Sequence, residues 1–224
     1  MHKWFISSDF ESVSKAAADF LEDKINENIN EAGVSRIALP GGRSPCLTLS
    51  FLAEKKLPWN KVYWYLGDER CYPKGHSERN DKMLEEVLWS KLPDTTHVYS
   101  MPTELGAEKA AEAYREVISK FDSFDIIFLG MGEDGHTASL FPDNPALQDE
   151  RSVVPVFNSP KPPSDRVSLS VDTIKRARYR MIVTAGGTKA PIIKNVKQGA
   201  SLPVNQVGEI YWFVDEKAVA KSAE

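Results

Sequence analysis

FDIIFLG, residues 124–130, is a short, largely apolar segment that leads directly into MGEDGHTASLFP at 131–142. Its apolar character, without regular alternation of polar residues, is typical of a strand buried on both faces of a parallel sheet. KVYWYLG at 61–67 and VSRIAL at 34–39 are similar in length and character, and PGGRSP at 40–45 follows the latter as a turn. We therefore expect these three segments to be strands of one largely parallel sheet.

Between these apolar segments, apolar residues recur at the spacing of an α-helix. Residues 10–32 place apolar side chains on one stripe, from Val13 to Ile29, and Gly33 follows as a stop signal. Further helices are expected at 45–55, 78–90, 104–120 and 188–197, and further strands at 153–157, 166–171, 179–185 and 209–214. Alternating strands and helices predict the α/β class, and the 224 residues fit a single domain, 1–224.

Composition and charge exclude several classes of protein. Hydrophobic residues make up 42% and charged residues 27%, which allows a sizeable core and argues against disorder. The formal charge is −4 without any basic run, so we expect neither nucleic acid nor an anionic membrane as partner. No apolar window reaches the length of a signal peptide or a membrane span, which favours a cytoplasmic protein. Cys46 and Cys71 make neither a disulfide framework nor a cysteine zinc site.

Ligands of open α/β sheets bind outside the carboxyl ends of the strands, so the strand ends are the places to look for function. After the first strand, Gly41 and Gly42 allow the backbone to approach a ligand, and Arg43 and Ser44 add hydrogen-bond donors. The helix expected next would direct its free N–H groups at the same point, which suits a phosphate. The alternative is an ordinary turn with an exposed arginine.

Two other strand ends carry charged residues. Asp68 and Arg70 directly follow a fully apolar strand, so at least one of them is a candidate for a cleft rather than for a solvated loop. His76 is nearby, but the sequence has no pair of histidines at metal-ligand spacing, and we expect no metal. Lys189 follows two glycines before an expected helix and is a second candidate for binding phosphate, or else an ordinary surface lysine.

The segment after residue 129 allows two interpretations. Gly130, Gly132 and Gly135 match the G-x-G-x-x-G pattern of dinucleotide-binding proteins. That pattern should open a long helix, however, and here only residues 136–141 precede Pro142.

The other interpretation centres on His136. Its ordinary pKa of about 6.5 suits a general base near neutral pH. In a glycine-rich loop, Asp134 can orient the imidazole although it lies only two residues away. A purely structural histidine is the alternative.

Four motifs together resemble the 6-phosphogluconolactonase family. They are PGGRSP (40–45), GDERCYP (67–73) with Ser77 to Asn80 after it, GMGEDGHTASLFP (130–142) and AGGTKA (185–190), in matching order along nearly the whole chain. Glucosamine-6-phosphate deaminases also carry an Asp-Gly-His loop, but Ile-Ala-Phe-Asn-Glu-Pro follows it there, whereas Thr137–Pro142 follows here. The first loop departs from the family's more common Gly-Gly-Ser-Thr-Pro at Arg43-Ser44, but it keeps the glycines and a hydroxyl.

The resemblance implies a modified Rossmann-like sheet flanked by helices, with neither a metal nor an organic cofactor. It implies hydrolysis of 6-phospho-D-glucono-1,5-lactone to 6-phosphogluconate in the oxidative pentose phosphate pathway. A sugar-phosphate deaminase and a sugar-phosphate sensor without catalysis stay open as alternatives. We expect a monomer, although the sequence does not exclude an oligomer.

Lactone opening requires a base for water and donors for the developing oxyanion. We expect His136 to be the base and Asp134 to hold its tautomer. Arg70, or the N–H groups of residues 130–136, would stabilise the oxyanion. The remaining predicted residues would bind the phosphorylated substrate: Gly41, Gly42, Arg43, Ser44, Asp68 and Lys189.

Overall fold

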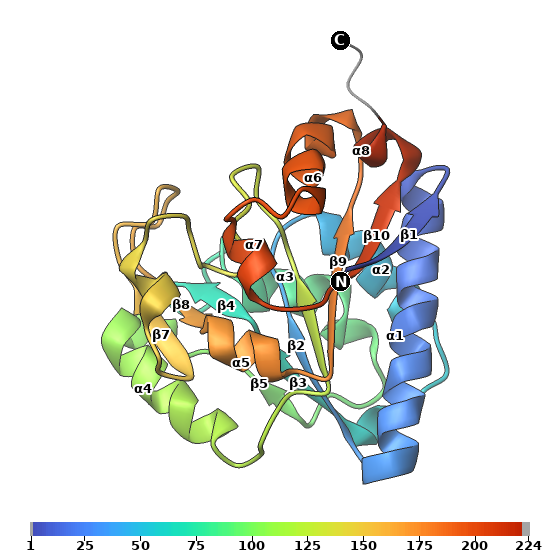
Figure 1. Cartoon of the computed structure of the whole chain (residues 1–224). Helices are drawn as coiled ribbons and strands as arrows, with labels where there is room; N and C mark the ends of the chain where they lie inside the picture. Colours follow the sequence, from blue (N-terminus) through green and yellow to red (C-terminus); the bar gives the residue numbers. More distant parts are fainter. Residues whose placement is uncertain (1, 221–224) are drawn as a thin grey trace.

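A seven-stranded parallel sheet runs through the centre of the protein in this computed structural model, which describes residues 2–220 (Figure 1). The strand order is β1-β10-β9-β6-β2-β3-β5. The strands are β1 (Lys3–Ser7), β2 (Ser35–Leu39), β3 (Val62–Leu66), β5 (Val98–Tyr99), β6 (Ile126–Leu129), β9 (Tyr179–Thr184) and β10 (Tyr211–Asp215). The predicted α/β class with a largely parallel sheet is confirmed.

The order in which strands are added to the sheet changes direction between β2 and β6. From β2 the chain builds β3 and β5 on one side, then returns to build β6, β9 and β10 on the other. Ala38 of β2 pairs with Ile127 of β6, so the loops after these two strands begin side by side. Such a switch point is where open α/β sheets bind ligands.

A second, smaller sheet is antiparallel and has the order β4-β8-β7. Its strands are β4 (Asp68–Arg70), β7 (Val153–Val156) and β8 (Arg166–Leu169). The strands expected at 153–157 and 166–171 are present, but they belong to this second sheet and not to the parallel one. Gly67 explains the division: its N–H donates to Leu39 O in the main sheet, while its carbonyl accepts from Leu169 N in the small one.

The helices follow the capping signals in the sequence. In α1 (Phe10–Ala32), Asp9 accepts a hydrogen bond from Ser12 N at the start, and Gly33 ends the helix with a φ of 82°. The other helices are α2 (Ser44–Ala53), α3 (Asn80–Val87), α4 (Ala107–Ile118), α5 (Val171–Arg176), α6 (Ala190–Lys197), α7 (Pro203–Gln206) and α8 (Glu216–Val219). Short 3₁₀ turns lie at Trp59–Lys61, Trp89–Lys91, Thr103–Leu105, Pro145–Gln148 and Gly187–Lys189.

α1 and α4 lie over different strands. α1 packs on α2 and contacts β1, β2, β9 and β10, whereas α4 packs on β7 and β8 (Figure 1). Most side chains of the central strands are buried, and Ile37 and Ile126 are fully so. Within residues 2–220 no helix combines the length and the apolar character that crossing a membrane requires.

Candidate active site

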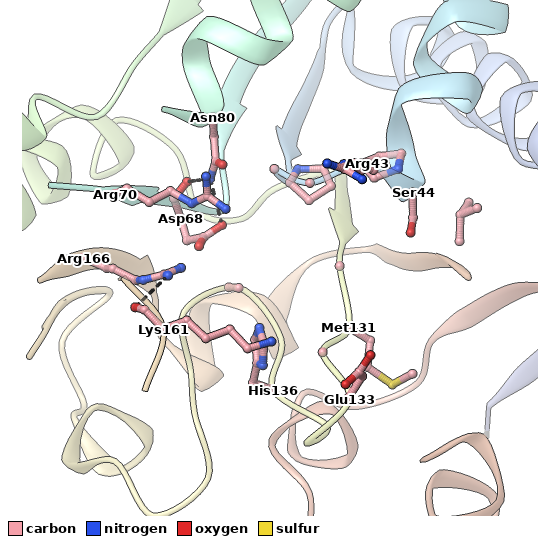
Figure 2. A pocket seen from close by; sticks show the side chains of 18 of the residues that line it. Arg43, Ser44, Asp68, Arg70, Asn80, Met131, Glu133, His136, Lys161 and Arg166 are labelled. Carbon is pink, nitrogen blue, oxygen red and sulfur yellow. Dashed lines mark hydrogen bonds between the residues drawn. The ribbon is translucent and has the colours of Figure 1, made fainter. Parts of the chain in front are cut away.

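A cavity of about 340 Å³ lies where the loops after β2, β6 and β9 meet β4 and the segment between β7 and β8 (Figure 2). Every residue predicted for the site lines this cavity except Asp134, which contacts His136. The predicted residues that line it are Gly41, Gly42, Arg43, Ser44, Asp68, Arg70, His136 and Lys189. Folding thus brings together residues from four separate strand ends.

The predicted contact between His136 and Asp134 is present. The imidazole Nδ1 lies 2.5 Å from Asp134 Oδ1, and the same carboxylate oxygen accepts the backbone N–H of His136 at 3.2 Å. With Nδ1–H donating to the carboxylate, Nε2 is the ring nitrogen that can accept a proton. The ring also packs on Phe141, with 4.5 Å between centroids, which limits its rotation.

Burial determines the titration of this pair. It lowers the pKa of His136 below 6.5, and the hydrogen bond to Asp134 offsets only part of that effect, while Lys161 lowers the pKa further. Burial also opposes ionisation of Asp134, but the hydrogen bonds from His136 outweigh it and hold the pKa of this carboxyl below its usual value. At neutral pH the pair is therefore a neutral imidazole beside a carboxylate, the state that a general base requires.

The loop after β6 is folded tightly around the histidine. Gly132 N donates to His136 O at 3.0 Å, and a Cβ on Gly132 would lie 2.1 Å from two atoms of the imidazole. The G-x-G-x-x-G segment does not open a helix here, because the chain passes through turns to the 3₁₀ helix Pro145–Gln148. The feature on which a dinucleotide-binding interpretation depends is absent from this loop.

The first loop leads into α2 as expected. This helix begins at Ser44, with Pro45 in its first turn, and no side chain caps its N-terminus. Ser44 and Pro45 both line the cavity, so the positive end of the helix dipole faces it. Lys189 also lines the cavity, and its Nζ donates to Met131 O at 3.3 Å and links the loops after β9 and β6.

Asp68 and Arg70 extend from β4 into the cavity wall. Ser139 Oγ donates to Asp68 Oδ2 at 2.6 Å, and Asn80 Nδ2 donates to the carbonyl of Asp68 at 2.9 Å. Arg70 is held by a 2.6 Å hydrogen bond from its NH1 to the carbonyl of Glu78. Asp68 is almost fully buried, and one of its carboxylate oxygens is bound by Ser139. It therefore forms part of the cavity floor.

Sequence reasoning missed four polar residues of the wall: Asn80, Glu133, Lys161 and Arg166. Arg166 is almost fully buried, and its guanidinium donates to the carbonyls of Lys161 and Pro162 at 3.1 and 2.9 Å. It thereby holds the segment from which the Lys161 side chain extends toward His136 (Figure 2). Arg166 could have been found from the sequence, because it is a charged residue at the start of the apolar run RVSLSV. Lys161 lies in a proline-rich loop, and no sequence pattern there indicates a role in the site.

The comparison with protein families matches residues 8–214 to the family described as glucosamine-6-phosphate isomerases/6-phosphogluconolactonase. The chain belongs to this family. A 6-phosphogluconolactonase of Mycobacterium leprae is 32% identical over 238 residues, which cover 96% of each chain. The family assignment thus rests on nearly the whole length of the protein.

Solved structures agree on the fold. A 6-phosphogluconolactonase from Thermotoga maritima superposes with a TM-score of 0.90 at 29% identity, covering 96% of this chain and 100% of that one. A monomeric glucosamine-6-phosphate deaminase reaches a TM-score of 0.82 at 16% identity, covering 96% and 98%. At that identity the deaminase shows the fold alone. Both branches of the family therefore share this architecture, and the residues of the cavity must distinguish them.

Proposed function

We propose that this protein hydrolyses 6-phospho-D-glucono-1,5-lactone to 6-phospho-D-gluconate, with His136 as the general base. The contact between His136 and Asp134 in a cavity lined by cations is the observation that carries the proposal. Relatives such as the Mycobacterium leprae 6-phosphogluconolactonase support the substrate class.

The reaction is the addition of water to the ester carbonyl of the lactone. His136 Nε2 takes a proton from water as its oxygen bonds to the carbonyl carbon, and the carbonyl becomes an oxyanion. When the oxyanion collapses, the bond to the ring oxygen breaks, and His136 returns the proton to that oxygen. Asp134 keeps the imidazole oriented and stabilises its protonated form. The product acid ionises and releases a proton to solvent.

Two tasks remain, binding of the 6-phosphate and stabilisation of the oxyanion, and we assign them to two different walls of the cavity. Arg43, Ser44 and the N-terminus of α2, together with Lys189, form the wall that we assign to the 6-phosphate. Arg70 lies on the opposite wall, beside Arg166 (Figure 2). We assign the stabilisation of the oxyanion to Arg70, because a fixed guanidinium needs little reorganisation as charge develops.

The first test of the proposal is the rate at which freshly generated 6-phosphogluconolactone releases acid at neutral pH, after subtraction of the spontaneous rate. Acceleration by the protein supports lactone hydrolysis. No acceleration, together with ammonia release from glucosamine 6-phosphate, would assign the protein to the deaminases instead. Tight binding of 6-phosphogluconate without turnover of either substrate would indicate a sensor.

Replacing Lys189 by alanine is expected to raise KM about 10- to 100-fold with little change in kcat. The lost charge-assisted hydrogen bond would be worth about 1.5–3 kcal/mol, in the bound substrate and the transition state alike. Steady-state kinetics on the lactone measures both constants. Lys194→Ala, which removes an exposed lysine from the same helix region, is the matched control. A fall in kcat at unchanged KM would contradict the assignment.

The acid limb of the pH profile should move in opposite directions in two variants. Activity falls with pH as His136 becomes protonated, through a pKa below 6.5. Asp134 raises this pKa, so Asp134→Asn should shift the limb to lower pH, whereas Lys161→Met should shift it to higher pH. The measurement is kcat/KM against pH at constant ionic strength. Shifts in the same direction would exclude His136 as the group that titrates.

A further inference from the structure

Glu69 is a fully buried carboxylate that the proposed mechanism does not use. It lies in β4 between Asp68 and Arg70, and strand alternation directs its side chain away from the face that carries those two residues. Its oxygens accept three backbone hydrogen bonds, from Arg70 N at 2.8 Å, Asn80 N at 2.7 Å and Asp81 N at 2.9 Å. One carboxylate therefore binds the backbone of two different elements.

Two of these bonds supply the cap that α3 otherwise lacks. Arg79 occupies the N-cap position, but its side chain makes no capping hydrogen bond to a backbone N–H of the helix. Glu69 instead accepts the N–H groups of the first two helical residues, and a negative charge at this end also interacts favourably with the helix dipole. The position of α3 relative to β4 thus depends on the Glu69 carboxylate.

The first residue of α3 belongs to the cavity. Asn80 lies against Gly41 so closely that a Cβ on that glycine would be 1.8 Å from Asn80 Oδ1. Its Nδ2 also donates to the carbonyl of Asp68. A shift of α3 would therefore displace the PGG turn, the floor at Asp68 and the backbone of Arg70 together.

The surroundings of Glu69 make its charge sensitive to pH. Burial raises the pKa of this carboxyl to about 7, although the three backbone N–H groups partly oppose the shift. Arg79 Nε lies 4.0 Å from Oε2, and that guanidinium is itself bound by Asp81 at 2.6 Å and Glu104 at 3.1 Å. The titratable and charged groups around Glu69 are Arg79 and Asp81 of α3, Tyr114 of α4, Cys71 after β4, and Arg166 of β8.

We propose that Glu69 is a positioning residue for the reaction, whose ionised carboxylate fastens the first turn of α3 to β4 and so holds Asn80 and Arg70 at the cavity. This inference rests on the proposed lactone hydrolysis. Protonation turns one carboxylate oxygen into a donor, and a donor cannot face the N–H groups that it now accepts. The cavity wall then loosens without any loss of a group that touches the substrate.

The pH profile of kcat/KM is the first test. Wild type should lose activity through two ionisations on the acid side, one near pH 7 from Glu69 and one at lower pH from His136. Glu69→Gln should lower kcat/KM about 10-fold above pH 7, where wild-type Glu69 is ionised, approach the wild-type value at lower pH, and leave a single ionisation. Glu104→Gln, which removes a different carboxylate from Arg79 but no hydrogen bond to the backbone of α3, should keep both ionisations. Two ionisations in Glu69→Gln would overturn the inference.

A second measurement needs neither a folded variant nor turnover. Amide exchange at Asn80 and Asp81 in wild type, followed by NMR and corrected for intrinsic rates, should accelerate as the pH falls through the Glu69 transition. The carboxyl carbon of Glu69 reports that transition directly. Unchanged protection across the transition would refute the role of Glu69. If exchange accelerates as expected but the protein has no lactonase activity, the role of Glu69 in holding α3 stands and only the proposed function is refuted.

Discussion

Replacing His136 by alanine is expected to lower kcat by about 10²–10⁴-fold, the usual contribution of a positioned general base. Nε2 is the only ring nitrogen of this residue free of the Asp134 contact, and alanine offers the attacking water no acceptor in its place. The substitution removes no cation from the cavity, so affinity for 6-phosphogluconate should change little. The measurement combines lactone hydrolysis, corrected for the spontaneous rate, with calorimetric binding of the product.

His97→Ala is the matched control for this experiment. His97 precedes β5, at the opposite end of the strands from the cavity, and stacks on Tyr63. Its removal should leave kcat within a few-fold of wild type. Turnover close to wild type in His136→Ala would remove the general base from the mechanism, whatever the control shows.

Replacing Gly132 by alanine should lower kcat/KM by about 10²-fold, although residue 132 has no side chain to contribute to the reaction. The new Cβ would lie 2.1 Å from the imidazole and 2.7 Å from Asp134 Oδ1, so the ring must move or the loop must open. The hydrogen bond from Gly132 N to His136 O resists the second adjustment. A displacement of about 1 Å at a catalytic group is sufficient for a loss of this size.

The control for Gly132→Ala is Gly187→Ala in the loop after β9. A Cβ on Gly187 has no atom within 4 Å, and this glycine does not line the cavity. Both substitutions reduce the entropy of the unfolded chain in the same way, so a difference between them reports the contact with His136. Equal kinetics for the two variants would show that the loop adapts without disturbing the base.

Local sequence patterns were sufficient to predict β2, β3, β6, β9 and β10 of the main sheet, but not β1 or β5, and the part of the site at the strand ends. The apolar runs that became β2, β3 and β6 each stop where the chain turns to the cavity, so Gly41, His136 and Asp68 could be selected without coordinates. The contact between His136 and Asp134 was predictable because it is formed within three residues of one loop.

The parts that sequence reasoning missed depend on contacts between distant segments. β4 is recognisable only through its pairing with β8, nearly 100 residues later, in which Arg70 lies opposite Arg166. Asn80 reaches the cavity because Glu69 caps α3, which no local pattern reveals. β1 lies at the edge of the sheet and is largely exposed, so it has no continuous buried character in the sequence.

The division at Gly67 has a consequence for altering this protein by design. The proposed base, His136, lies in a loop of the parallel sheet, whereas Lys161 and Arg166 belong to a hairpin of the small sheet. That hairpin begins and ends in paired strands, from Val153↔Leu169 to Val156↔Arg166, and can be exchanged as a cassette without cutting the loop around the imidazole. Libraries confined to residues 157–165 that keep Lys161 would therefore sample new substrate preferences while His136, Asp134 and the lysine that lowers the pKa of His136 stay in place.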